Sequence, residues 1–279
     1  MAQATLLPSV TLPDGIEMPQ LGFGVFQVPA EETQKTVELA LEAGYRHIDT
    51  AAAYRNEKGV GAALAASGLP REDYFVTTKL WNSQQGHDST LAAFEASLER
   101  LGLDHVDLYL IHWPAPTEGR FVDTWRAFEQ IHREEAARTI GVSNFRIEDL
   151  QLLERETETR PTVNQIELHP RLQQGDLRAW HAEQGIATEA WSPLAQGELL
   201  DDETIAAVAA SHGKTPAQTI LRWHLQLGNV VIPKTVTPQR IRENIALFDF
   251  ELSDDDMAAI EDLDSRSRIG PDPATFVTP

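Results

Sequence analysis

The amino-acid sequence predicts a (β/α)8 TIM barrel built as a single domain over residues 1–279. Eight short hydrophobic, strand-like runs alternate with amphipathic helical segments over about 250 residues, the pattern of a parallel barrel. No linker, low-complexity tract or internal repeat divides the chain. A doubly wound sheet would need a nucleotide-binding fingerprint near the start, but Gly22-x-Gly24 lacks its third glycine because Gln27 stands there.

The chain begins with a predicted β-hairpin that caps the barrel. Two short apolar runs, 9–12 and 16–19, flank the turn Pro13-Asp14-Gly15. Hydrophobic runs rich in β-branched and aromatic residues then predict the eight barrel strands. These runs are 21–24, 47–49, 75–79, 106–112, 139–143, 162–167, 187–191 and 230–233.

Helical periodicity fills most of the intervals between the strands. The predicted helices are 31–43, 89–101, 148–156, 176–184, 216–227 and 238–248. Gly44 and Gly102 follow the first two, where glycine commonly ends a helix. Thr237 and Pro238 are a typical cap and first residue of the last. The polar tail, 264–279, is predicted to form a loop over the mouth of the barrel or to fray.

The composition excludes several classes of function. The formal net charge is −20, which repels phosphate backbones and anionic lipid, so we expect no nucleic-acid or membrane partner. The absence of cysteine excludes disulfides, thiolate nucleophiles and thiolate metal sites. The first five residues lack the basic and apolar regions of a signal peptide, and no apolar run approaches the roughly 18 residues of a membrane span. We therefore expect a cytoplasmic protein.

Four polar side chains stand at or just after the ends of predicted strands: Asp49, Tyr54, Lys79 and His112. The C-terminal ends of barrel strands meet at one mouth, so we expect these groups to lie together. Tyr54 is the predicted general acid, with its pKa lowered by Lys79, which Asp49 keeps charged. His112 can orient a substrate carbonyl and assist proton transfer. Such a cluster indicates carbonyl reduction.

Each of these residues alone is more often structural than catalytic. Lys79 could instead form a Schiff base, which would make the protein a lyase. A metal-dependent hydrolase would need clustered ligands, but His47-x-Asp49 has no paired histidine spacing to support it, and Lys79 would repel a cation. We therefore predict no metal.

Several longer motifs, in the same order, resemble the aldo-keto reductases, and within them most closely the bacterial 2,5-diketo-D-gluconic acid reductase group. The resemblance covers the chain from about residue 12 to residue 263. The motifs are GYRHIDTA at 44–51, TTKLW at 77–81, DLYLIHWP at 107–114, IGVSNF at 140–145, NQIELHP at 164–170 and IPKT at 232–235.

The resemblance implies that the four polar residues are the catalytic group and that the cofactor is NADPH/NADP+. It also assigns cofactor contacts: Ser143, Asn144 and Gln165 to the nicotinamide carboxamide, Trp191 to the nicotinamide ring, Ser192, Leu194 and Gly197 to the pyrophosphate loop, Lys234, Thr235, Val236 and Arg240 to the 2′-phosphate region, and Asn244 to adenine. A lysine and an arginine suit a phosphate dianion.

The expected substrate contacts are Phe26, Trp81, His112 and Trp113, an apolar collar with a polar fixed point. The resulting prediction is NADPH-dependent reduction of an aldehyde, ketone or keto-sugar acid, with Tyr54 as acid. A cofactor-bound, non-catalytic regulatory subunit is a further alternative. The family resemblance implies a monomer.

Overall fold

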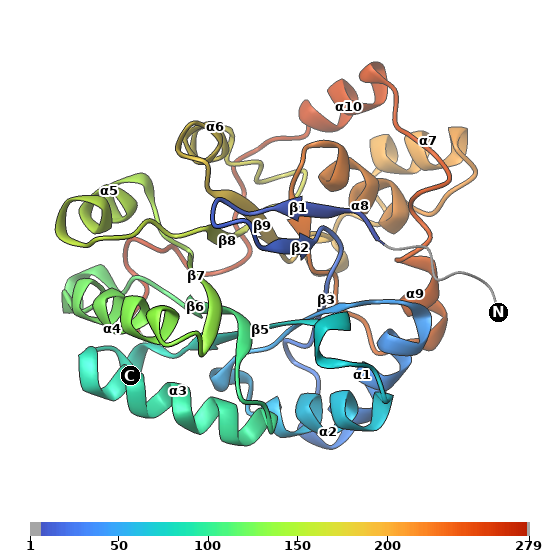
Figure 1. The fold of residues 1–279 in the computed structure, drawn as a ribbon. Coiled ribbons are helices and arrows are strands. Elements are labelled where there is room, and N and C mark those ends of the chain that lie inside the picture. Colours follow the sequence, from blue (N-terminus) through green and yellow to red (C-terminus); the bar gives the residue numbers. More distant parts are fainter. Residues whose placement is uncertain (1–6, 278–279) are drawn as a thin grey trace.

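The protein is described by a computed structural model that covers residues 7–277. The first six residues, on which the expectation about a signal peptide depends, and the last two of the tail lie outside the described part. Eight parallel strands form one sheet in chain order and are surrounded by helices (Figure 1). The strands are β3 (Phe23–Gly24), β4 (His47–Asp49), β5 (Phe75–Leu80), β6 (Val106–Ile111), β7 (Ala137–Ser143), β8 (Val163–Glu167), β9 (Ala187–Trp191) and β10 (Val230–Val231).

Backbone hydrogen bonds also join the two ends of this sheet. The N–H of Gly22 donates to the carbonyl of Val231 at 2.9 Å, and the N–H of Val231 donates to Gln20 at 2.9 Å. Gly24 donates to Pro233 at 3.1 Å, and Leu21 pairs with Val231 in parallel. The sheet therefore curls into a TIM-like barrel, as the alternation of elements predicted.

The predicted hairpin is present and covers the N-terminal end of the strands. Strands β1 (Ser9–Thr11) and β2 (Glu17–Pro19) pair in antiparallel fashion. Leu12 and Met18 are buried in one hydrophobic cluster with Phe75 and Val163, which begin β5 and β8. Because the hairpin closes this end, access to the barrel interior is left to the opposite end.

The six predicted helices are present, and four more lie outside the predicted ranges. The predicted set is α1 (Ala30–Ala43), α3 (His87–Leu101), α5 (Ile147–Glu156), α6 (Gly175–Gln184), α8 (Pro216–Gln226) and α9 (Pro238–Glu243). The additional helices are α2 (Glu57–Ser67), α4 (Phe121–Arg133), α7 (Glu203–Ser211) and α10 (Asp254–Glu261). Helix α9 ends earlier than predicted, at Glu243. None of the helices within residues 7–277 has the length and apolarity needed to cross a membrane.

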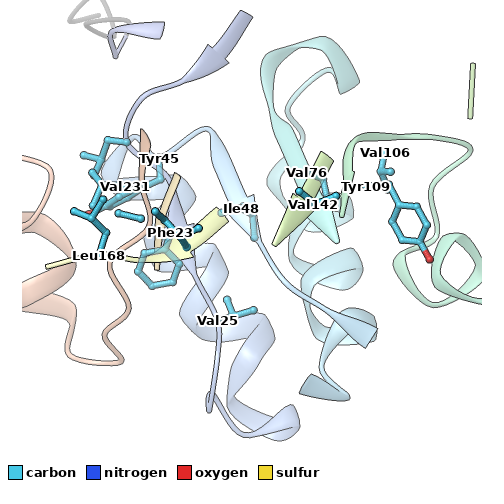
Figure 2. Close-up of a cluster of buried hydrophobic side chains, with 14 of the residues drawn as sticks. Phe23, Val25, Tyr45, Ile48, Val76, Val106, Tyr109, Val142, Leu168 and Val231 are labelled. Atoms are coloured by element: carbon cyan, nitrogen blue, oxygen red, sulfur yellow. The ribbon is translucent and has the colours of Figure 1, made fainter. Parts of the chain in front are cut away.

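A continuous hydrophobic layer fixes the helices on the strands. Figure 2 shows part of it, including Phe23, Tyr45 and Tyr109. The ring of Tyr109 on β6 stacks on Phe128 of α4 at a centroid distance of 4.4 Å. Close-packed interiors of this kind hold strand ends at fixed positions. The core therefore sets the relative placement of side chains at the open end of the barrel.

Candidate active site

The four polar residues predicted to meet do converge at the C-terminal ends of β4, β5 and β6. Asp49 is the last residue of β4, Lys79 lies near the end of β5, and His112 directly follows β6. The Nζ atom of Lys79 lies 2.6 Å from Oδ1 of Asp49 and 2.9 Å from the carbonyl of Thr50. The same Nζ is 3.4 Å from Oη of Tyr54. An ammonium thus faces a carboxylate on one side and a phenol on the other.

Tyr54 reaches this position from a single turn of 3-10 helix, η1 (Ala52–Tyr54), after β4. The turn ends at Arg55, which has a left-handed conformation, with φ of 57°. The ring of Tyr54 contacts the ring of Phe26 at a centroid distance of 5.1 Å and that of His112 at 5.6 Å. These aromatic neighbours hold the phenol oxygen beside Lys79.

Burial and the charges of neighbouring groups together set the pKa values of Asp49, Tyr54 and Lys79. Burial by itself lowers the pKa of Lys79, but Asp49 and then Tyr54 more than offset this, so its pKa is raised and it stays charged. Burial also raises the pKa of Asp49, although Lys79 opposes the change. For Tyr54, burial outweighs the attraction of Lys79, and the net pKa is raised. The predicted lowering of the Tyr54 pKa was therefore wrong in direction, because the sequence pattern does not give the cost of burying a phenolate.

His112 is neutral in this environment. Burial and then the charge of Lys79 lower its pKa well below the usual value for histidine. Its Nδ1 is buried without a hydrogen-bond partner, and its ring lies against Trp81 at a centroid distance of 5.1 Å. A neutral imidazole at the cavity wall can donate or accept one hydrogen bond.

A second carboxyl group lies behind Asp49 inside the barrel. The Nε2 of Gln165 donates to Oδ2 of Asp49 at 2.8 Å and to Oε2 of Glu189 at 2.9 Å. Glu189 is fully buried, and burial, followed by the charge of Asp49, raises its pKa to about 8. The sequence interpretation missed this residue. The sequence feature that could have revealed it is a charged residue in the middle of an otherwise uncharged strand, β9.

Asp49, Tyr54, His112 and Gln165 line a cavity of about 1600 Å³ at the mouth of the barrel, whereas Lys79 and Glu189 do not form part of its lining. A cavity of this size accommodates an extended cofactor together with a small substrate. Eleven of the twelve predicted cofactor residues line it: Ser143, Asn144, Gln165, Trp191, Ser192, Leu194, Gly197, Lys234, Thr235, Arg240 and Asn244. Val236 is outside this lining, and its side chain is 44% exposed.

The polar groups next to Trp191 form a connected network. Asn144 has a left-handed backbone, with φ of 64°, and its Nδ2 donates to the carbonyl of His112 at 3.0 Å. Its Oδ1 accepts from Nε1 of Trp191 at 2.8 Å, which fixes the indole plane. Ser143 donates to the carbonyl of Gln165 at 2.8 Å. A fixed indole beside amide and hydroxyl groups is a suitable platform for a planar ring that carries a carboxamide.

The cavity is also lined by cations, although the acidic Glu243 lines it too. Lys234 and Arg240 line it, and neither forms an ion pair with any residue in the described range 7–277. Two such cations in a chain with a net charge of −20 are well suited to an anionic group. The cavity therefore offers both a platform for a planar ring and cations for a phosphate group, a combination that fits NADPH.

The predicted substrate residues Phe26, Trp81, His112 and Trp113 also line the cavity. The sequence interpretation missed Ile269, Gly270, Pro271 and Phe276, which line the same region. The ring of Phe276 lies 4.4 Å from that of Trp113. Among residues 7–277, no group of three potential metal ligands is close enough together to hold a metal ion.

Comparisons with known proteins agree with this geometry. The profile of the Aldo/keto reductase family matches residues 20–265. An aldo-keto reductase of Mycolicibacterium smegmatis is 60% identical over 269 residues, which covers 96% of this chain and 98% of that protein. The methylglyoxal reductase DkgA of Yersinia pestis is 53% identical over 274 residues, covering 98% of each.

A solved structure is also closely similar. A mutant of Gox0644 in complex with NADPH superposes with a TM-score of 0.94 at 46% identity, covering 98% of this chain and 99% of that one. The identity extends over nearly the full length of both chains, and the matched segment contains the four converging residues. The chain therefore belongs to the aldo/keto reductase family.

Proposed function

We propose that this enzyme reduces the carbonyl group of a small aldehyde, ketone or keto acid with NADPH, with Tyr54 as the proton donor. The observation that carries the proposal is the contact between Oη of Tyr54 and the buried, charged Lys79 at 3.4 Å. When bound, the cofactor supplies a hydride to the carbonyl carbon. The remaining requirement is a proton for the carbonyl oxygen.

Tyr54 can meet this requirement because it is protonated at neutral pH. The O–H bond of Tyr54 breaks as its proton passes to the substrate oxygen, and the negative charge that forms on Oη faces the ammonium of Lys79. Asp49 holds that ammonium in place at 2.6 Å. Neutral His112 supports the same substrate oxygen by hydrogen bonding and thereby fixes the orientation of the carbonyl.

The proposed cofactor residues follow from the cavity lining and from the family motifs. Ser143, Asn144 and Gln165 would hold the carboxamide, and Trp191 would lie against the nicotinamide. The loop with Ser192, Leu194 and Gly197 would contact the pyrophosphate. The region of Lys234, Thr235, Val236 and Arg240 would hold the 2′-phosphate, and Asn244 would contact adenine. The side chains of Lys234 and Arg240 can bind the additional phosphate of NADPH, which favours NADPH over NADH.

The substrate is proposed to be small and to bind between Phe26, Trp81 and Trp113, with the C-terminal loop over the mouth. Similarity to a protein named methylglyoxal reductase supports a dicarbonyl compound. The long motifs noted in the sequence support placement within the 2,5-diketo-D-gluconic acid reductase group, and hence keto-sugar acids as further substrates. A Schiff base at Lys79 is disfavoured because a charged ammonium is not a nucleophile.

The experiment follows NADPH absorbance with methylglyoxal for wild type and Tyr54→Phe. Wild type should oxidise NADPH, and Tyr54→Phe should lose roughly 100- to 10,000-fold in kcat, the range for a general acid. Cofactor binding, measured by fluorescence, should be unchanged in the variant. Near-wild-type turnover by Tyr54→Phe would remove Tyr54 from its role.

We further propose that the chain is one domain and acts as a cytoplasmic monomer. The single eight-stranded sheet supports the first point. Sedimentation equilibrium at several concentrations tests the state of association, and cell fractionation tests the location.

A further inference from the structure

A buried carboxylate at the end of β8 holds part of the C-terminal tail. Glu167 is fully buried. Its Oε1 accepts the backbone N–H of Ile269 at 2.6 Å and contacts Nε2 of His169 at 3.0 Å. Its Oε2 accepts the backbone N–H of Gly270 at 3.0 Å and the guanidinium Nη1 of Arg268 at 3.4 Å. Both oxygens are fully engaged, and hydrogen bonds to a carboxylate are among the stronger ones in proteins.

The segment held by Glu167 lies directly against Trp191. A Cβ atom added to Gly270 would lie 2.4 Å from Cη2 of Trp191 and 3.0 Å from Oε2 of Glu167. Only glycine therefore permits this approach of the tail backbone to both side chains. The position of residues 268–270 is set by the barrel itself.

The chain then turns back toward the substrate end of the cavity. The N–H groups of Thr275 and Phe276 donate to the carbonyl of Asp272 at 3.1 and 2.9 Å. This turn places the ring of Phe276 4.4 Å from that of Trp113 and 6.5 Å from that of Trp81. Ile269, Gly270, Pro271 and Phe276 line the cavity, whereas Glu167 does not.

We propose that Glu167 is a positioning residue that limits substrate size, because its hold on residues 268–270 fixes Phe276 as one wall of the substrate pocket. The inference rests on the proposed reductase function, since substrate size is measured by turnover. Glu167 would act on specificity only through the tail, because its own side chain is outside the cavity.

The first experiment compares Glu167→Gln with wild type. Glutamine keeps the shape but turns an NH2 group toward backbone N–H donors, so the tail is released. The ratio of kcat/KM for a bulky aromatic aldehyde to that for methylglyoxal should rise roughly tenfold, the scale of discrimination by an apolar pocket. A purely structural role would lower both values equally and leave the ratio unchanged.

A matched control is a second carboxylate that accepts backbone N–H groups of a loop, with neither the carboxylate nor the loop lining the cavity. Oε1 of Glu129, on α4, accepts the N–H groups of Glu158 and Thr159 at 2.8 and 2.7 Å. Glu129→Gln should weaken that loop without changing the substrate ratio. Phe276→Ala should raise the ratio, and adding Glu167→Gln to it should have little further effect, because both changes act through one ring.

Hydrogen exchange tests the anchor without a substrate. The amides of Ile269 and Gly270 should lose protection in Glu167→Gln and keep it in Glu129→Gln. If Glu167→Gln does not fold, Ile269→Pro removes a donor from the tail while leaving the buried carboxylate in place. Unchanged protection or an unchanged ratio would overturn the inference. Absence of turnover by wild type would instead overturn the proposed function, with hydrogen exchange still testing the anchor.

Discussion

The Nζ atom of Lys79 and the Oδ1 atom of Asp49 are 2.6 Å apart, and both side chains are buried. Removing one member of a buried ion pair leaves the other charge uncompensated, which is far costlier than losing an exposed pair. This pair therefore bears both on folding and on the proposed role of Tyr54 as proton donor.

Asp49→Asn should reduce both stability and turnover. The buried ammonium of Lys79 loses its main stabilising charge, so its pKa should fall, and unfolding should become easier by about 3–5 kcal/mol. Urea unfolding and kcat measure the two losses. Asp107→Asn is the control, because Asp107 is a buried carboxylate that pairs with Arg71 and Arg138 outside the cavity. It should lower stability while kcat is retained; equal kcat losses would contradict the assignment of Asp49.

Glu189→Gln should flatten the dependence of stability on pH. The pKa of Glu189 is raised from 4.5 to about 8 in the folded protein. The stability that this raised pKa contributes is therefore fully present below pH 4.5, where the carboxyl is protonated in both the folded and the unfolded state. That contribution is lost as pH rises toward and through 8, by up to about 1.4 kcal/mol per pH unit for one proton.

Thermal unfolding of wild type should therefore show a Tm that falls between about pH 5 and 8. Glu189→Gln, which keeps an acceptor for Gln165, should show a shallower fall. If Tm falls equally with pH in wild type and in Glu189→Gln, Glu189 does not change its protonation in this range.

Arg240→Ala should weaken NADPH binding much more than NADH binding. Arg240 lines the cavity, and a hydrogen bond to a charged group contributes about 1.5–3 kcal/mol, which corresponds to roughly a tenfold or larger change in the NADPH/NADH ratio. Arg242 lies two residues away on α9 and does not line the cavity, so Arg242→Ala is the matched control. Fluorescence titration at fixed ionic strength gives both ratios; equal effects of the two variants would indicate only a general charge effect.

Gly61→Ala should destabilise the protein by about 3 kcal/mol, the upper range for overpacking. A Cβ at Gly61 would lie 2.1 Å from the carbonyl oxygen of Leu101, so α2 and α3 would have to separate. Gly175→Ala is the control, because an added Cβ there meets nothing within 4 Å. Urea unfolding should show a large loss for the first variant and almost none for the second.

The sequence determined the barrel and most of its site. Alternating strand and helix patterns fixed the element order, since each pattern depends on local side-chain periodicity. The placement of Asp49, Lys79 and His112 at strand ends was enough to predict their convergence, because parallel strands of a barrel share one direction. Four helices lie outside the predicted ranges. In α7 the only large apolar residues are Ile205 and Val208, so periodicity gives little signal there.

Only the tertiary structure decided the features that depend on burial and on contacts between distant segments. Burial turned the expected lowering of the Tyr54 pKa into a rise, because desolvation of the phenolate outweighs Lys79. Glu189 became part of the site only when β8 and β9 brought it to Gln165. The tail was assigned as a polar loop, and its contact with Glu167, across about a hundred residues of chain, appears only after folding. Local patterns set which residues can form the site, and packing sets their environment.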